Sequence, residues 1–239
     1  MRNDSPILIY GRNPVKEALR ANKVIKIYIS NNFNDKEINI LFEQLKPYIK
    51  VVSSNELTSK SNGGVHQGIV AEIKPYEYLD LDEIIRRSRK VEVPIIVILD
   101  GINDTHNLGA ILRSCDVFNV SGVLIPKHNQ VPLNATVAKS SAGAINFVPV
   151  AQISSINQTI QKLKDNGFWI VSTDGSAKID YTQIKYDFPI ALVIGSEGKG
   201  VSSLVVKNSD YVVKIPQYGH VNSLNASVAA GILLSRIRS

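Results

Sequence analysis

In the stretch Pro189-Ile190-Ala191-Leu192-Val193-Ile194-Gly195-Ser196-Glu197-Gly198-Lys199-Gly200-Val201, an apolar segment runs directly into a glycine-rich loop. The apolar segment shows no alternation with polar residues, which is typical of a strand buried on both faces of a parallel sheet. The glycines that follow let the backbone approach a ligand closely. Because ligands of open α/β sheets lie beyond the carboxyl ends of the strands, the stretch predicts a binding loop. An ordinary strand-to-helix turn is the alternative.

The composition sets the broad class of the protein. The chain has 239 residues, 44% of them hydrophobic, which is enough for one large domain or two smaller ones. No apolar run approaches the roughly 18 residues that span a bilayer, and the first residues lack the apolar stretch of a secretory signal. The single cysteine, Cys115, excludes an intrachain disulfide and is typical of a reducing compartment. We therefore expect a soluble, cytoplasmic protein with no membrane partner.

The charge balance favours an anionic partner. The formal net charge is +6 and the isoelectric point is about 9.3, without a long lysine-rich tail. This balance fits contact with nucleic acid but does not establish it. The four histidines and one cysteine form no cluster with metal-binding spacing, so we expect no metal site.

The pattern divides the chain into a small α/β domain at residues 1–74, a charged linker at residues 75–93 and a larger domain at residues 94–239. In the first domain we expect helices after Pro14 and over 38–45, and strands over 25–29, 49–52 and 66–71. The linker holds a short helix and the basic residues Arg86, Arg87, Arg89 and Lys90. This cluster is either a solvated helix face or a phosphate contact.

Strands and helices alternate through the larger domain. We expect strands over 94–100, 122–125, 147–150, 168–173, 190–194 and 211–215, and helices over 109–118, 153–166 and 224–236. This alternation predicts an α/β fold with a parallel sheet that is covered on both faces.

Three segments of this domain place polar residues where strands end. The first, Asp100–Cys115, contains Asn107 and Arg113; the second is the opening loop, with Glu197; and the third, Ile215–Asn225, enters the last helix near Ser223. Helix capping explains Asn107 and Ser223 as well as a functional role does. Cys115 lies on an apolar helical face with no basic neighbour, which favours packing over nucleophilic catalysis.

These segments resemble, in order and spacing, the three signature motifs of the SpoU/TrmH (SPOUT) family of RNA ribose 2′-O-methyltransferases. The matching residues are Asn107 and Arg113 in the first motif, Gly195-Ser-Glu197-Gly in the second, and Ile215-Pro216 with Asn222-Ser223-Leu224-Asn225-Ala226 in the third. Thr105 stands where the first motif usually has proline. The front part, with Tyr10–Leu19 and His66–Val70, resembles the L30e-like substrate-binding domain of the RlmB-type branch, which methylates a guanosine in 23S ribosomal RNA.

The resemblance implies a C-terminal SPOUT domain with a parallel sheet and a deep trefoil knot, which folding topology alone would not suggest. It also implies a homodimer that uses S-adenosyl-L-methionine to methylate ribosomal RNA. The cofactor contacts it implies are Thr173, Gly175, Gly195, Ile215, Pro216 and Leu224. The catalytic residues it implies are Arg113, Glu197, Asn107, Ser223 and Asn225.

Arg113 is the residue most directly tied to the chemistry by this resemblance. A guanidinium stays protonated in proteins, so holding a phosphate or stabilising a developing alkoxide suits Arg113 better than acting as a base. In the first domain, Arg12, Asn13 and Lys16 either contact RNA or only begin a helix.

Two other functions compete with this interpretation. The loop could bind nucleotide phosphates, although it has neither the Walker A spacing nor the order G-x-G-x-x-G. The chain could also be a non-catalytic RNA-binding assembly factor, although intact Arg113, Glu197 and Asn225 argue against that. Within the family, transfer RNA is the alternative substrate.

Overall fold

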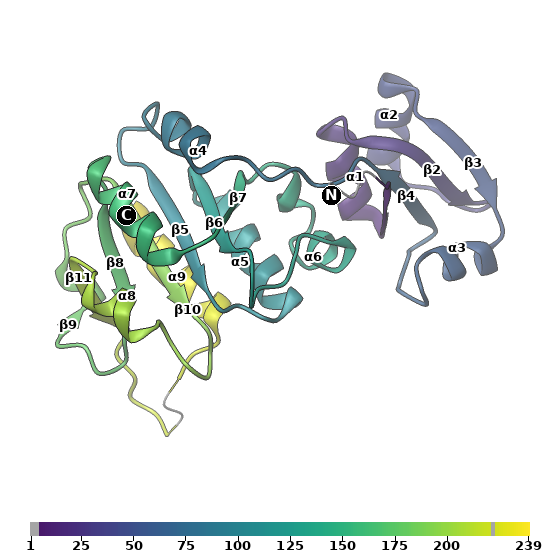
Figure 1. Ribbon diagram of the computed structural model, residues 1–239. Coiled ribbons are helices and arrows are strands. Elements are labelled where there is room, and N and C mark those ends of the chain that lie inside the picture. Colours follow the sequence, from purple (N-terminus) through teal and green to yellow (C-terminus); the bar gives the residue numbers. More distant parts are fainter. Residues whose placement is uncertain (1–4, 221–222) are drawn as a thin grey trace. The chain divides into compact units, whose positions relative to one another are not determined.

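The fold is taken from a computed structural model, which describes residues 5–220 and 223–239 (Figure 1). The chain forms two compact units. The first unit comprises Met1–Glu77 and Pro132–Phe147, and the second comprises Tyr78–Val131 and Val148–Ser239. The segment Pro132–Phe147 therefore belongs to the first unit, although the sequence placed it in the larger domain.

The first unit contains a four-stranded sheet in the order β1-β4-β2-β3. Its strands are β1 (Ile7–Tyr10), β2 (Val24–Ser30), β3 (Tyr48–Val52) and β4 (Ile69–Ile73). Only β2 and β3 pair in parallel, and the other neighbours are antiparallel. The helices of this unit are α1 (Arg12–Arg20), α2 (Lys36–Leu45), α3 (Ser54–Lys60) and α6 (Ala135–Ser140), followed by the 3-10 turn η1 (Ala144–Asn146).

Side chains on the two faces of this sheet pack differently. Helix α1 packs on β1, β2 and β4, whose residues Ile27, Ile69, Ala71 and Ile73 are fully buried. On the opposite face Tyr28, Val52 and Val70 form a smaller cluster with Leu57 of α3. Because α3 has only seven residues, it covers one part of that face.

The second unit contains a seven-stranded sheet in the order β7-β6-β5-β10-β8-β11-β9. Its strands are β5 (Ile95–Asp100), β6 (Gly122–Pro126), β7 (Val150–Ile153), β8 (Trp169–Thr173), β9 (Ile179–Asp180), β10 (Ile190–Gly195) and β11 (Tyr211–Lys214). Every strand pair of this sheet is parallel among the residues described. This confirms the predicted α/β fold, and it places β10, the apolar segment that opened the sequence analysis, between β5 and β8.

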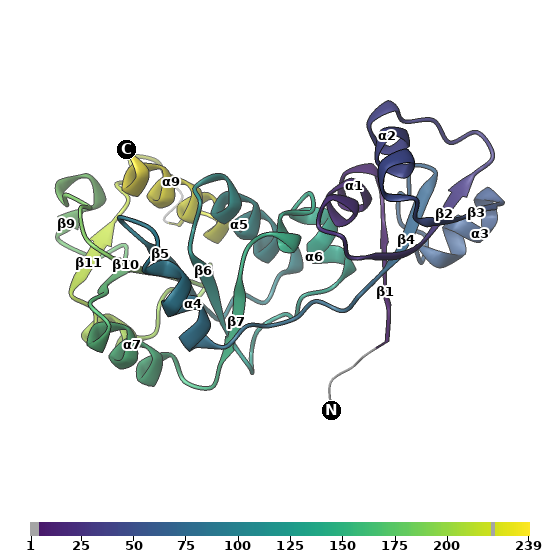
Figure 2. The ribbon, with the colours of Figure 1, turned by 90° about the horizontal axis from the view of Figure 1, so that it is seen from above.

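Helices cover both faces of the large sheet, as the alternating sequence predicts (Figure 2). These helices are α4 (Leu81–Ser88), α5 (Thr105–Val117), α7 (Ile156–Asp165), α8 (Ser203–Lys207) and α9 (Ala226–Arg238). Helices α5 and α9 lie together on one face, and α4 and α7 lie on the other. None of the helices described in the chain is long and apolar enough to cross a membrane.

Helix α4 belongs to the core of this unit, although the sequence placed it in a linker. Ile84 and Ile85 are buried with residues of β6 and β7, and the backbone N–H of Leu79 donates to the Val150 carbonyl at 2.8 Å. A Cβ on Gly122 would lie 2.5 Å from Ile84, so glycine is needed where helix and strand meet. The part of the expected linker from Tyr78 onward is thus a structural element of the second unit.

The basic cluster on α4 behaves as a solvated helix face. Arg86 and Arg87 both bind the carboxylate of Glu83, at 2.7 and 2.6 Å, and the pKa of Glu83 is lowered by hydrogen bonds from Arg87 and then Arg86. Arg89 donates to Asn166 at 3.1 Å. These contacts favour the structural interpretation of the cluster over a phosphate site.

Several elements differ from the sequence prediction. Strand β7 begins at Val150, because Phe147 closes the turn η1 through its bond to the Ala144 carbonyl. Helix α5 begins four residues earlier than expected, at Thr105. The elements β1, α3, α6, α8 and β9 were not predicted from the sequence, and all of them are short.

Candidate functional site

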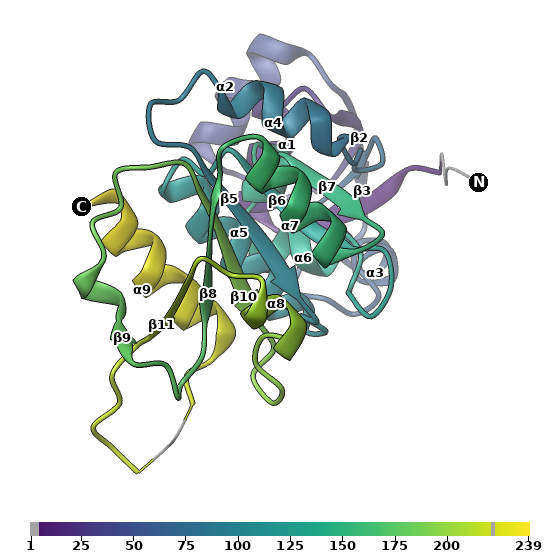
Figure 3. The same cartoon turned by 60° about the vertical axis from the view of Figure 1, so that its left-hand side comes forward.

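Three loops of the second unit meet at the carboxyl edge of the large sheet. They follow β8, β10 and β11, and all leave the sheet at the same end (Figure 3). Together with the start of α9 they surround a cavity of about 240 Å³. Residues that line it include Thr173, Asp174, Gly175, Gly195, Glu197, Lys199, Lys214, Ile215, Gln217, Ser223, Leu224 and Ala229. A parallel sheet favours a ligand site at this edge.

The loop after β10 folds back on itself. The Gly200 N–H donates to the Ser196 carbonyl at 2.8 Å, and Gly200 has a left-handed φ of 66°. A Cβ on Gly195 would lie 2.1 Å from the Gly200 carbonyl carbon, so only glycine fits where the loop crosses its own beginning. The end of the loop is fixed to β5, because Asp100 accepts from the Ser202 N–H at 2.9 Å. The sequence analysis did not assign this role to Asp100.

A hydrogen-bonded group of three side chains joins the three sequence segments. Asn107 donates its Nδ2 to Oε1 of Glu197 at 2.9 Å, and Asn225 donates its Nδ2 to Oδ1 of Asn107 at 2.8 Å. Asn225 also contacts Glu197 Oε1 directly. Residues far apart in the sequence therefore hold Glu197 in the wall of the cavity.

The helix caps fall on other residues than those expected. Asp104 caps α5, since its side chain accepts from the His106 N–H at 2.8 Å. Asn225 caps α9, since its Oδ1 accepts from the N–H groups of Ser227 and Val228 at 2.9 and 3.3 Å. Capping by Asn107 or Ser223 is thus wrong as an explanation: Asn107 binds Glu197, and Ser223 lines the cavity.

The cavity combines apolar and charged walls. Ile194, Val213, Ile215 and Leu224 supply apolar surface, whereas Asp174 and Lys199 supply charge. Hydrogen bonds from the Ser176 hydroxyl and N–H lower the pKa of Asp174 below its ordinary value, which favours its ionised form at neutral pH. Asp174 was missed by the sequence analysis, and its position directly after an apolar strand is the signal that could have revealed it.

Most of the residues implied as cofactor contacts come together here. Thr173, Gly175, Gly195, Ile215 and Leu224 all line the cavity, as do Glu197 and Ser223. Pro216 is not among the lining residues that the structure describes, and Asn222 lies outside the described residues. Among the residues from 5 to 220 and from 223 to 239, no group of histidine, cysteine or carboxylate side chains could hold a metal ion.

Comparison with known protein families decides the family of this chain. The sequence model of the SpoU rRNA Methylase family matches residues 94–235. The chain belongs to the SpoU methylase family. A second model, for the substrate-binding region of RNA 2′-O ribose methyltransferases, matches residues 8–79. The protein is thus an RNA methyltransferase with two family-typical parts.

Individual SpoU relatives cover nearly the whole chain. A Staphylococcus haemolyticus protein assigned to the TrmH family of tRNA/rRNA methyltransferases is 43% identical over 236 residues, which span 97% of this chain and 94% of the relative. The SpoU methyltransferase AviRb from Streptomyces viridochromogenes, solved with AdoMet, has a TM-score of 0.81 at 23% identity and covers 98% of this chain and 89% of its own. This structural similarity shows the shared fold. A TrmH/SpoU tRNA modifying enzyme from A. aeolicus has a TM-score of 0.56 at 30% identity, over 67% of this chain and 83% of its own.

Two other residues that the sequence analysis weighed lie elsewhere in the SpoU part. Arg113 on α5 is exposed, lies outside the cavity lining, and makes no hydrogen bond or ion pair with the rest of the described chain. Cys115 is fully buried, and burial raises the pKa of its thiol well above the ordinary value. A packing role for Cys115 is therefore confirmed.

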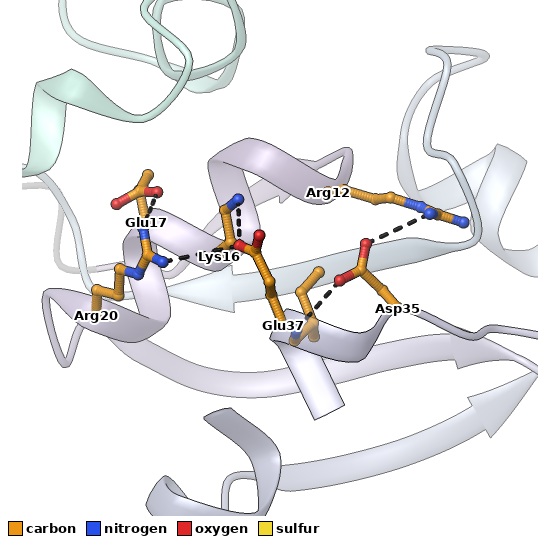
Figure 4. Close-up of polar contacts among 7 residues, drawn as sticks. Arg12, Lys16, Glu17, Arg20, Asp35 and Glu37 are labelled. Carbon is orange, nitrogen blue, oxygen red and sulfur yellow. Dashed lines mark hydrogen bonds and ion pairs between the residues drawn. The ribbon is translucent and has the colours of Figure 1, made fainter. Parts of the chain in front are cut away.

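The candidate RNA-binding residues of the first unit lie at the start of α1 (Figure 4). Arg12 pairs with Asp35 at 3.3 Å and Lys16 with Glu37 at 2.8 Å, while Asn13 is exposed in the first turn. The hydrogen bond from Lys16 also lowers the pKa of Glu37. The positive charges expected to meet RNA are thus already paired with carboxylates.

Proposed function

We propose that this protein transfers a methyl group from S-adenosyl-L-methionine to a ribose 2′-hydroxyl of RNA. One observation carries the proposal: the second and third segments that resemble the family motifs line one cavity, and Asn107 of the first segment is hydrogen-bonded to them through Glu197 and Asn225. The AviRb structure was solved in complex with AdoMet, which supports the choice of cofactor.

The cavity fits the chemistry of this cofactor. Ile194, Ile215 and Leu224 would flank the adenine, and the bare backbone at Gly175, beside which no atom lies within 4 Å of a Cβ position, leaves room for close approach. Asp174 and Glu197 place negative charge in the lining, which also contains Lys199 and Lys214, and these carboxylates suit the cationic sulfonium and amino groups. When bound, the cofactor supplies an electrophilic methyl group. The residues of this chain would then hold the two reactants in line.

The substrate hydroxyl would be positioned by Glu197, Asn225 and Ser223. Glu197 and Ser223 line the cavity, and Asn225 contacts Glu197. Arg113 would hold a substrate phosphate or stabilise the developing alkoxide, because its guanidinium remains protonated. Its exposed position outside the cavity lining supports a role toward RNA over a role toward the cofactor.

The proposed substrate is a guanosine of 23S ribosomal RNA, with transfer RNA as the alternative. The substrate-binding region at residues 8–79 supports an RNA that needs a second contact surface. The relatives that match nearly the whole chain are named as tRNA/rRNA methyltransferases, so both transfer RNA and ribosomal RNA are tested as substrates. We further propose a cytoplasmic homodimer whose C-terminal part follows the knotted family path; exposed Val117 on α5 and Val228 on α9 supply apolar surface for self-association.

Methyl transfer with labelled cofactor tests this function directly. Purified protein is incubated with ribosomal RNA and with transfer RNA, and the modified ribose is mapped by its resistance to alkaline cleavage. Label in one 23S guanosine is the expected result, and label only in transfer RNA would select the alternative. No transfer to any RNA would refute the proposal, and RNA binding without cofactor binding would favour the assembly-factor hypothesis. Sedimentation of the purified protein reports the dimer.

A further inference from the structure

One face of the sheet in the first unit is only partly covered. Strand register places Glu72, Lys26 and Tyr48 side by side in one row, and Val70, Tyr28 and Lys50 in the next. Helix α3 covers the second row at Tyr28 and Val70 through Leu57. The first row ends at Tyr48 on the edge strand β3, where the side chain is 64% exposed.

Lysines and tyrosines lie side by side on this side of the sheet, and we name the group Lys26, Tyr28, Tyr48, Lys50 and Lys60 the lysine-tyrosine face. Tyr28 is buried against Leu57 of α3, whereas Tyr48 is exposed. The Lys26 ammonium lies 5.1 Å from the centroid of the Tyr28 ring and 5.0 Å from that of Tyr48. The Lys60 ammonium lies 4.1 Å from the Tyr28 ring on the same face. Ring faces thus hold the ammonium groups close together at the surface.

The carboxylates near this face are few and already occupied. Glu72 accepts a hydrogen bond from the Tyr28 hydroxyl at 2.5 Å. Glu56 lies 4.0 Å from Lys50 and 3.9 Å from Lys60, so its carboxylate is shared between two long ion pairs. Lys26 makes no ion pair with any residue in the described part of the chain. A phosphate can therefore approach Lys26 without displacing a carboxylate.

The lysine-tyrosine face differs in this respect from the start of α1. There Arg12 and Lys16 bind Asp35 and Glu37 at 3.3 and 2.8 Å, and at the end of the same helix Arg20 binds Glu17 at 2.8 Å. A phosphate that approaches them meets these carboxylates as well (Figure 4). Moreover, no aromatic side chain as exposed as Tyr48 occurs in the first unit as far as the structure describes it. The lysine-tyrosine face thus combines the exposed ring of Tyr48 with Lys26, whereas at the start of α1 the guanidinium of Arg12, which lies 5.7 Å from the Phe33 ring, is already paired with Asp35.

We propose that the lysine-tyrosine face binds a single-stranded segment of the RNA substrate, with a base stacked on Tyr48 and phosphates on Lys26, Lys50 and Lys60. Sequence-tolerant recognition of unpaired RNA combines an aromatic platform with lysine or arginine contacts to the backbone. An open sheet face presents both at fixed spacing, because side chains two residues apart point to the same side. The proposal rests on the proposed function in one respect, namely that the ligand is RNA.

Binding of an oligonucleotide to the full-length protein tests the proposal. The probe is a fluorescein-labelled, single-stranded oligouridine of about 12 nucleotides, within the usual range of single-strand sites, and it is titrated by anisotropy at several salt concentrations. Tyr48→Ala is expected to weaken binding at least about fivefold through lost stacking, whereas Tyr48→Phe keeps the ring and stays within about twofold. Equal affinity of Tyr48→Ala and the parent would overturn the proposal and leave the face to a protein partner.

Two double variants compare the two basic clusters of the first unit. Lys26→Ala/Lys50→Ala removes two positive charges from the lysine-tyrosine face, and Arg12→Ala/Lys16→Ala removes two from the start of α1. The first pair is expected to reduce the slope of log affinity against log salt by about 1.4, since each phosphate contact to a single strand contributes about 0.7. The second pair is expected to change the slope by less than half of that. The reverse order would assign RNA binding to α1 and refute the proposal.

A fluorescence reporter tests the position of the base itself. The chain has one tryptophan, Trp169, so Trp169→Phe combined with Tyr48→Trp leaves a single indole on the lysine-tyrosine face. Stacking should quench this indole when the oligouridine binds; unchanged emission at saturation would contradict stacking at position 48. Methyl transfer is measured in parallel on ribosomal RNA. If the parent protein methylates RNA but the variants of the lysine-tyrosine face bind the oligouridine as tightly as the parent does, this inference alone is refuted. If the parent protein shows no methyl transfer but these variants bind the oligouridine more weakly, the proposed function alone is refuted.

Discussion

Replacing Gly195 by alanine should distort the cavity in the second unit more than any other single methyl group added to the loop after β10. The new Cβ would lie 2.1 Å from the Gly200 carbonyl carbon and 2.3 Å from the Val201 nitrogen. Both contacts are with backbone, so no change of rotamer relieves them. The two arms of the loop must separate, and the bond from Gly200 N–H to the Ser196 carbonyl, now 2.8 Å long, must break or stretch. Overpacking and one lost hydrogen bond together cost about 2–4 kcal/mol.

The matched control is Gly198→Ala in the same loop. No atom lies within 4 Å of a Cβ at Gly198, so its cost should stay within about 0.5 kcal/mol. Thermal unfolding should show Gly195→Ala about 4–16 °C below the control, and calorimetric titration should show at least roughly tenfold weaker binding of S-adenosyl-L-methionine. If the two variants melt together and bind the cofactor equally, the loop does not need glycine at this crossing and the reasoning fails.

Three further changes probe the network, the exposed arginine and the buried thiol. Asn225→Asp keeps the oxygen that caps α9 but places a carboxylate next to Glu197. Its melting temperature should therefore stay unchanged while kcat/KM falls at least about tenfold. Asn225→Ala also removes the cap, and it should in addition lower the free energy of unfolding by about 1 kcal/mol. Arg113→Ala should abolish methyl transfer, while the free energy of unfolding changes by less than about 0.5 kcal/mol and the cofactor affinity by no more than a few-fold. A large loss of cofactor binding would contradict the assignment of Arg113 to the RNA side of the site. Cys115 should react with a thiol reagent at pH 8 only after the chain is unfolded, because burial raises the pKa of its thiol; rapid labelling of the native protein would contradict its packing role.

The sequence predicts the large sheet well because its central strands carry a strong signal. Strands β5 and β10 are continuous apolar runs, and such runs leave little choice but burial on both faces. The short elements carry no such signal. Strand β9 has two residues and α8 has five, so neither is long enough to show a periodic pattern in the sequence. Both are stabilised by contacts that form only in the folded chain. Helix α4 is the instructive case: its charged face predicts a linker, while Ile84 and Ile85 on the other face pack into the core.

The site was predictable as a set of segments but not as a set of contacts. The glycine-rich loop and the polar strand ends point to the correct edge of the sheet from sequence alone. Which asparagine caps a helix and which binds Glu197 depends on where each helix begins, and helix ends are uncertain by one or two residues from any pattern. A start at Thr105 moves Asn107 into the first turn of α5 and frees its side chain for Glu197. Asp100 and Asp174 were missed because their partners, Ser202 and Ser176, are set by loop geometry.

Asn225 links the stability of the second unit to the geometry of its site. Its Oδ1 satisfies N–H groups at the start of α9, which have no partner within the helix. Its Nδ2 binds Asn107 and contacts Glu197, which come from the start of α5 and the loop after β10. An amide has an acceptor and a donor on one rigid plane, so the oxygen cannot cap the helix without turning the nitrogen toward the cavity. The start of α9 therefore determines where Glu197 is held. A residue that offers only an oxygen at position 225 keeps the helix cap but no longer donates a hydrogen bond to the Glu197 carboxylate.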